Sequence, residues 1–166
     1  MEEGENLRTL GEVAIERCEL PHTQVLDAAH DGEHSLEVQL PFLQMVLDDF
    51  ALVPLVVGDA ATAEVSDVLD ALWDGPSSLV VVSTDLSHYH PYDLAMAIDA
   101  RTVTRIVARR PGEIGSDQAC GVRPLRGLLK TAASRDLAVV PLDVRNSGDT
   151  AGDHNQVVGY GSFAVG

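Results

Sequence analysis

Hydrophobic residues along this chain follow two spacings, and the two alternate. Compact apolar runs at 52–58, 79–82, 137–144 and 157–165 contain mainly strand-forming residues, which predicts four strands. Between most of these runs, apolar residues recur every three or four positions, which predicts helices. Alternating strands and helices are typical of an α/β fold with a largely parallel sheet flanked by helices. We expect the last two strands to pair antiparallel.

The predicted helices cover 36–47, 60–73, 91–109 and about 124–134. Pro41 interrupts the first of them, so that helix either kinks there or begins near Pro41 after a single turn. The core-facing positions, in chain order, are Leu36, Leu40, Leu43 and Leu47; Val65, Val68, Leu69 and Leu72; Leu94, Ile98, Val103 and Ile106; and Leu125, Leu128, Leu129 and Ala132.

The apolar run at 79–82 ends abruptly in a polar stretch. Buried polar groups are costly unless they are paired or used, and open α/β sheets place their ligands at the carboxyl ends of strands. We therefore expect Asp85, His88 and His90 to lie just past the carboxyl end of this strand. If the chain has a functional site, His34 and Cys120 must converge on the same point.

His88 and His90 are two residues apart, so on an extended backbone they point the same way. Such a pair can supply two metal ligands, or a base and its neighbour, and Asp85 can orient the His88 ring through its second nitrogen. The alternative is that these are turn residues before a helix that starts at Pro91. We favour this alternative for His90 and a functional role for His88.

Cys120 comes directly before a predicted helix, followed by Gly121. The positive end of the helix dipole favours the thiolate, which is both a nucleophile and a metal ligand. Glycine lets the backbone pass close to whatever the sulfur binds. Free cysteines are also among the most buried residue types, so a purely structural role is the alternative.

Composition limits the classes of function. The chain has 166 residues, 45% hydrophobic and 22% charged, which suits one globular domain. A net charge of −15 argues against nucleic acid and an anionic membrane as partners, and no apolar run has membrane-spanning length. The two cysteines imply no disulfide framework, so we expect free thiols and a cytoplasmic location. The acidity indicates either a halophilic, salt-adapted cytoplasm or an acidic protein from a biased genome.

Three segments in order, 33–43, 83–89 and 119–121, resemble the Memo family, also called AmmeMemoRadiSam system protein B. The closing segment 158–164 also matches, and the resemblance runs from about Gly11 to the last residue. That family is similar to the class III extradiol dioxygenases, which are non-haem iron enzymes. The resemblance therefore implies a three-layer α/β fold of the class III extradiol dioxygenase type.

The resemblance also assigns roles to individual residues. His34 matches a histidine of the family's metal-site cluster, and Cys120 matches the cysteine that replaces the dioxygenases' carboxylate ligand. His88, with Asp85, matches the histidine near the dioxygenases' acid/base position. The implied cofactor is iron or copper, with zinc as an alternative. The implied partners are a small molecule or, as in animal members, a peptide; a homo-oligomer is also among the expected assemblies.

One departure from the family pattern concerns the beginning of the chain. The family starts with a strand and a His-Ala-Gly type motif, and nothing in residues 1–31 matches it. We therefore expect residues 1–166 to form a single Memo-like domain that is N-terminally incomplete, with an exposed sheet edge. The first hypothesis is a metal-binding protein of the dioxygenase or redox type, inactive if the truncated chain lacks a ligand. The alternatives are a Cys–His nucleophile without metal, and a non-enzymatic module that binds peptides or proteins through the same pocket.

Overall fold

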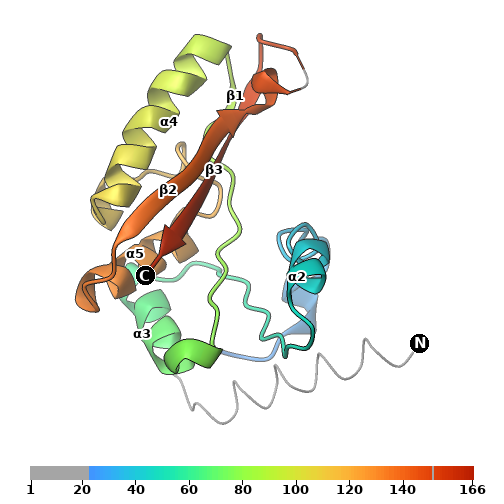
Figure 1. Cartoon of the computed structure of the whole chain (residues 1–166), viewed down its shortest axis with the longest axis vertical. Helices are drawn as coiled ribbons and strands as arrows, with labels where there is room; N and C mark the ends of the chain where they lie inside the picture. Colours follow the sequence, from blue (N-terminus) through green and yellow to red (C-terminus); the bar gives the residue numbers. More distant parts are fainter. Residues whose placement is uncertain (1–22, 151) are drawn as a thin grey trace. The chain divides into compact units, whose positions relative to one another are not determined.

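A computed structural model describes residues 23–150 and 152–166 (Figure 1). The chain divides into two compact units, one up to Ala60 and one from Ala61 onward, and each is described by itself. Every helix and strand in the described part other than η1 and α2 belongs to the second unit.

The described residues of the first unit, 23–60, form a short helix, α2 (Leu40–Val46), and a 3-10 turn, η1 (Asp27–Ala29). Pro41 lies in the first turn of α2, where its missing N–H costs nothing, and residues 35–39 form turns before it. The second reading of Pro41, a helix that starts near it after a turn, is therefore confirmed. The run at 52–58 was expected to be a strand and has no regular secondary structure, so that expectation was wrong.

The second unit is built on three helices, and all three were expected from the spacing of apolar residues. They are α3 (Thr62–Leu72), α4 (Tyr92–Val107) and α5 (Val122–Ser134). Three short 3-10 turns connect elements, namely η2 (Gly75–Ser77), η3 (Pro111–Glu113) and η4 (Ser147–Asp149).

The sheet of the second unit has three strands in the order β1 (His88–His90), β3 (Val157–Val165) and β2 (Val139–Asn146). Both pairings are antiparallel. The antiparallel pairing of the last two strands is therefore confirmed, and the fold is mixed α/β. The described residues show no parallel pair. The run at 79–82 is not a strand either, because a β-branched run favours extended backbone but a sheet also needs a partner.

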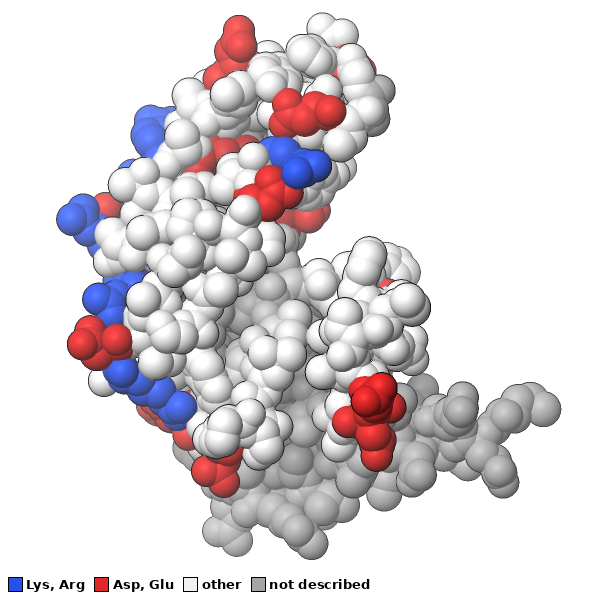
Figure 2. Space-filling model, viewed as in Figure 1, with Lys and Arg blue, Asp and Glu red and all other residues white. Residues whose placement is uncertain are grey.

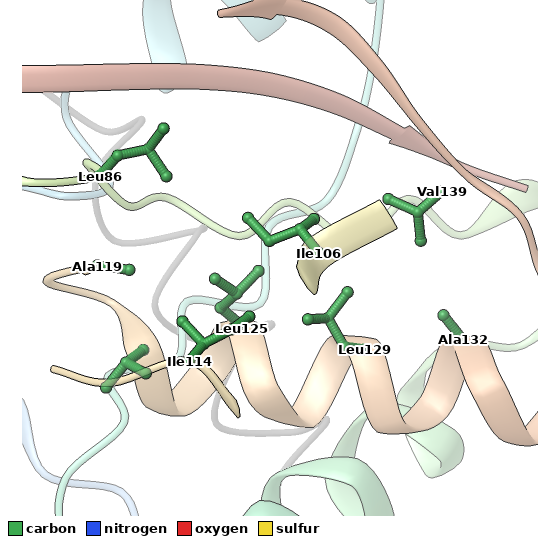
Figure 3. Close-up of a cluster of buried hydrophobic side chains, with 9 residues drawn as sticks. Leu86, Ile106, Ile114, Ala119, Leu125, Leu129, Ala132 and Val139 are labelled. Carbon is green, nitrogen blue, oxygen red and sulfur yellow. The ribbon is translucent and has the colours of Figure 1, made fainter. Parts of the chain in front are cut away.

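The hydrophobic core of the second unit lies between α5, α4 and the end of the sheet (Figure 3). Its buried residues are Leu86, Ile106, Ile114, Ala119, Val122, Leu125, Leu129, Ala132 and Val139. The face expected for α5 is confirmed, since Leu125, Leu128, Leu129 and Ala132 are all buried. The face expected for α4 was partly wrong. That helix buries Ala95, Asp99, Thr102 and Ile106, while Leu94 is exposed.

Charged side chains of the second unit are mixed rather than segregated on the face shown in Figure 2. The blue of Lys and Arg runs along α4 and α5 with carboxylates between. Ion pairs of the second unit include Arg105 with Glu113 at 3.8 Å, Arg109 with Asp136 at 3.3 Å and Arg135 with Asp70 at 2.9 Å. This face therefore offers no uninterrupted basic patch. Among the described residues, no helix is long and apolar enough to span a bilayer.

Candidate metal centre

The polar stretch after 79–82 is tied to the sheet by its backbone. Leu86 donates its N–H to the Gly159 carbonyl at 2.8 Å, and the Gly159 N–H donates to the Ser87 carbonyl at 2.8 Å. β1 then continues this antiparallel contact, with His88 opposite Val158. The expectation that Asp85 and His88 lie just past the end of a strand at 79–82 was wrong, since that run is not a strand and His88 itself begins β1.

Between the two histidines of β1 the backbone departs from a regular strand. Tyr89 has a φ of 58°, in the left-handed region that a bulky residue rarely adopts, and the pairing register shifts between His88 and His90. Both histidines are half-buried and Tyr89 between them is exposed. His88 belongs to the cluster described below, and His90 does not.

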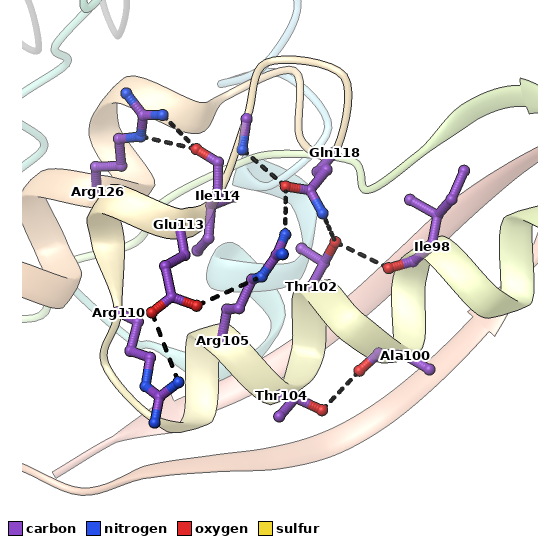
Figure 4. A network of polar contacts seen from close by, with 11 residues as sticks. Ile98, Ala100, Thr102, Thr104, Arg105, Arg110, Glu113, Ile114, Gln118 and Arg126 are labelled. Atoms are coloured by element: carbon purple, nitrogen blue, oxygen red, sulfur yellow. Dashed lines mark hydrogen bonds and ion pairs between the residues drawn. The ribbon is translucent and has the colours of Figure 1, made fainter.

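Cys120 follows a loop that a buried glutamine, Gln118, holds in place. Figure 4 shows the contacts of the Gln118 side chain. The Gln118 side-chain oxygen accepts hydrogen bonds from Arg105 at 2.9 Å and from the Gly115 N–H at 2.8 Å. Its amide nitrogen donates to Thr102 at 3.2 Å. Arg126 on α5 also donates to the Ile114 carbonyl in the same loop.

The Cys120 loop meets the 83–88 stretch at a close backbone approach. The Gly121 N–H donates to the Thr84 hydroxyl at 2.8 Å. A Cβ at Gly121 would lie 2.8 Å from the Thr84 Cβ and 2.9 Å from the Ser83 carbonyl oxygen, so only glycine fits without a shift. Since α5 begins at Val122, the expected position of Cys120 just before a helix is confirmed.

Three candidate ligand groups come together at this approach. One ligand atom each from Asp85, His88 and Cys120 lies within 4.8 Å of the others. The Cys120 sulfur accepts a hydrogen bond from the Asp85 N–H at 3.1 Å and lies 3.5 Å from the Thr84 hydroxyl. The sulfur is exposed, and the side chains of Asp85 and His88 are 46% and 35% exposed, so the cluster is open to solvent.

The histidine of the cluster has an unsatisfied nitrogen. His88 Nε2 lies 3.3 Å from an Asp85 carboxylate oxygen, but the two are not aligned as a hydrogen bond. Nε2 is itself buried and has no hydrogen-bond partner among the described residues. Buried nitrogens without a partner are rare in proteins and need an explanation, of which a bound ion is one. A thiolate, an imidazole and a carboxylate are a donor set that fits iron, copper or zinc.

His34 lies in the first unit, and its side chain is 83% exposed. Its Nδ1 is 3.3 Å from a Glu37 carboxylate oxygen. The Glu33 carboxylate accepts hydrogen bonds from the Ser35 and His34 N–H groups at 2.8 and 2.9 Å, and these donors hold the pKa of Glu33 below its usual value. The convergence of His34 with Cys120 stays a prediction.

A second polar cluster lies at the start of α4. The Tyr92 hydroxyl donates to Asp149 at 2.6 Å, and the Tyr92 ring stacks on His154 with centroids 4.4 Å apart. This hydrogen bond raises the pKa of Tyr92 and lowers that of Asp149. The cluster ties α4 to η4 and contains no member of the metal candidate.

Three contributors to the site were missed by sequence reasoning. Thr84 lies in the 83–89 segment that resembles the family, but its position beside the Cys120 sulfur follows only from the fold. Gln118 carries no signal in the sequence patterns and is buried. Asp99 was placed outside the core-facing set of its helix and is also buried. No apolar spacing marks Asp99, because the buried face of α4 differs from the predicted one.

The comparisons with known proteins converge on one family. Residues 12–164 match the family model described as Memo-like protein. A MEMO1 family protein of Methanothermobacter thermautotrophicus, MTH_45, is 37% identical over 148 residues, which cover 81% of this chain and 53% of that protein. MK0963 of Methanopyrus kandleri, also a MEMO1 family protein, is 34% identical over 148 residues, covering 81% and 52%.

A third relative, a MEMO1 family protein of Sulfolobus acidocaldarius, is 33% identical over 170 residues, covering 93% of this chain and 59% of that protein. The chain therefore spans about half the length of the curated relatives it matches.

Proposed function

Because this chain belongs to the Memo-like protein family, we propose that it is a metal-binding protein of the dioxygenase or redox type. The metal is held by the Cys120 thiolate together with His34, beside the imidazole of His88 and the carboxylate of Asp85. The observation that carries this proposal is the meeting of the Asp85, His88 and Cys120 ligand atoms within 4.8 Å. The cofactor is iron or copper, with zinc as the alternative that the same ligands accept.

The site residues have two proposed roles, which are metal binding and proton transfer. The Cys120 sulfur binds the metal, and the Asp85 N–H that donates to this sulfur keeps it in place. His88 holds or moves a proton at its ring, and an Asp85 carboxylate oxygen lies 3.3 Å from the His88 Nε2. When bound, iron or copper supplies one-electron and Lewis-acid chemistry. The exposure of the sulfur lets a small molecule or a peptide side chain reach the site.

The proposal includes the sheet architecture that the family resemblance implies. In that architecture, the apolar run at 79–82 forms part of a three-layer, largely parallel sheet of the class III extradiol dioxygenase type. Support comes from its side chains, since Leu79 and Val81 are exposed at 69% and 47% although both are strongly apolar. Residues 1–166 are then one domain of that architecture, and a homo-oligomer is the assembly to test first by size-exclusion chromatography with light scattering.

The test is metal loading of the purified chain with Fe²⁺, Cu²⁺ or Zn²⁺, followed by elemental analysis. We expect one metal ion per chain in the wild type and at least a tenfold loss of affinity in Cys120→Ser and His34→Ala. His90→Ala is the matched control, because His90 lies in β1 next to the cluster without belonging to it. Unchanged stoichiometry and affinity in Cys120→Ser and His34→Ala would exclude this metal centre.

A second candidate function is a Cys–His nucleophile that works without metal. It is favoured by one observation, namely that the exposed Cys120 sulfur accepts the Asp85 N–H in a cluster that also contains His88. This function predicts rapid iodoacetamide alkylation of Cys120 near neutral pH, slowed in His88→Ala. Peptide mapping by mass spectrometry separates Cys120 from Cys18, which lies outside the described residues. A rate no faster than that of a model thiol contradicts it.

A further inference from the structure

Asp99 is a buried carboxylate that neither candidate function uses. It lies on the inner face of α4 and is 4% exposed. No lysine or arginine of the described residues forms an ion pair with it. Burial of a carboxylate is costly unless hydrogen bonds replace its water, so a retained one needs a specific partner.

The partner of Asp99 is the backbone of the metal-site stretch. Its Oδ1 accepts the Ser87 N–H at 3.0 Å in a fully buried setting. Its Oδ2 faces Gly159 so closely that a methyl group at that position would overlap the carboxylate. The carboxylate is thus enclosed between the Ser87 amide and the glycine of β3.

Ser87 lies between the two site residues that the stretch carries, Asp85 and His88. Its N–H is bound by Asp99 and its carbonyl by the Gly159 N–H at 2.8 Å, so both of its backbone polar groups are held. The preceding residue, Leu86, is 2% exposed and belongs to the core. Both peptide groups of Ser87 therefore have fixed directions, and those directions set where the Asp85 and His88 side chains emerge.

We propose that Asp99 is a positioning residue for the Asp85–His88–Cys120 cluster, which acts by holding the Ser87 amide. This inference rests on the proposed metal function and deepens it. One oxygen of the Asp99 side chain accepts the Ser87 N–H, and the rest of the carboxyl group packs against Gly159, so both its shape and its acceptor fit this position. Metal ligands and catalytic groups need their supporting contacts to hold them within a fraction of an ångström, and loss of such contacts costs 10–100-fold in metal affinity.

A purely structural role is the competing explanation, since Asp99 also joins α4 to β3. The two explanations predict different effects of replacing Asp99. A structural anchor alters the stability of the folded chain and leaves the ligand geometry of the folded fraction intact. A positioning residue alters the affinity and the coordination spectrum of a metal in the folded protein.

The experiment titrates the metal-free full chain with Co²⁺, whose visible and thiolate charge-transfer bands report ligand number and the Cys120 bond. Asp99→Ala removes the acceptor, and Asp99→Glu displaces the carboxylate by one methylene while keeping the charge. We expect both variants to bind Co²⁺ at least tenfold more weakly, with the charge-transfer band retained and the visible bands altered. Asp99→Asn keeps an oxygen for the Ser87 N–H, and we expect binding within about threefold of wild type.

Asp93→Ala is the matched control, because Asp93 is an exposed acidic residue in the first turn of the same helix. Circular dichroism and urea unfolding define the folded fraction. If Asp99→Ala does not fold, the Co²⁺ titration of Asp99→Glu tests the positioning role. Wild-type Co²⁺ affinity and spectrum in a folded Ala or Glu variant overturns the positioning role. Identical titrations of wild type and Cys120→Ser instead overturn the proposed metal function, and the positioning role with it.

Discussion

Asp85 and His88 reach the candidate metal centre on one segment and Cys120 on another, and the contacts that hold these segments differ in kind. The 83–88 segment is held through its backbone, by Gly159 of β3 and by one buried carboxylate, Asp99. The Cys120 loop is held by several side chains, among them the Gln118 network and Arg126. A segment with one side-chain anchor is sensitive at that anchor, whereas a network spreads the effect of a single change.

The largest effect is expected from Gly159→Ala, because the added methyl group meets both the carboxylate carbon and an oxygen of Asp99. Overpacking of this kind costs about 2–3 kcal/mol of unfolding free energy. We also expect at least a tenfold loss of metal affinity, because the displaced carboxylate releases the Ser87 amide. Urea unfolding and metal titration measure the two effects.

Gly112→Ala is the control for this substitution, since a Cβ there meets nothing within 4 Å. Equal stability of the two alanine variants would contradict the close packing of Asp99 on β3.

A smaller effect is expected from Gln118→Ala. The substitution leaves the Arg105 and Gly115 donors without their acceptor, which costs about 2 kcal/mol by urea unfolding. Metal affinity is expected to fall less than in Asp99→Ala, because Arg126 and the Gly121–Thr84 hydrogen bond still hold the loop.

Thr104→Ala is the control for this substitution, since it removes only an exposed hydroxyl contact within α4. Its unfolding free energy should stay within about 0.5 kcal/mol of wild type. A greater loss of metal affinity in Gln118→Ala than in Asp99→Ala would contradict the expectation that the 83–88 segment is more sensitive to a single change than the Cys120 loop.

Thr84→Val tests the contact between the two segments themselves. The Thr84 hydroxyl accepts the Gly121 N–H and donates to the Asp85 carbonyl, and valine has the same shape without these hydrogen bonds. We expect a loss of about 1 kcal/mol in unfolding free energy, with Thr84→Ser close to wild type. A valine variant as stable as the serine variant would show that the hydroxyl contributes nothing to holding Cys120 beside Asp85.

The smallest effect is expected from Tyr92→Phe, which removes an exposed side-chain hydrogen bond at the far end of α4 from the core. The Tyr92 hydroxyl lowers the pKa of Asp149 below 3.8, so its stabilisation is present above that pH and lost as the pH falls through the lowered value. The same bond raises the pKa of Tyr92 above 10, so its stabilisation is present below pH 10 and lost at higher pH.

The difference in stability between wild type and Tyr92→Phe should therefore be greatest at intermediate pH and narrow towards both extremes. Urea unfolding of both proteins from pH 2 to 11 measures it. A difference that is constant across this range would contradict the hydrogen bond, and any change in metal affinity would connect this cluster to the site.

The spacing of apolar residues along the chain was enough to predict the helices of the second unit. The apolar positions of α5 follow from a repeat of three and four residues, and all four predicted core residues are buried, because one helix face is defined by adjacent turns alone. The same reasoning misplaced the face of α4. Asp99 and Thr102 are polar, and hydrogen bonds offset the cost of burying them. Asp99 bonds to Ser87 and Thr102 to Gln118, and both partners lie outside α4.

For the site, the residue types, their order along the chain and the family resemblance nominated His34, whose convergence stays a prediction, and also Asp85, His88 and Cys120. Their meeting was a matter of tertiary structure, because the contact between Asp85 and Cys120 joins residues 35 positions apart. Periodicity reports which side of an element is buried, and it carries no information about which distant segment covers that side. The distances at the sulfur, the left-handed backbone at Tyr89 and the anchoring of Ser87 all arise from packing between such segments.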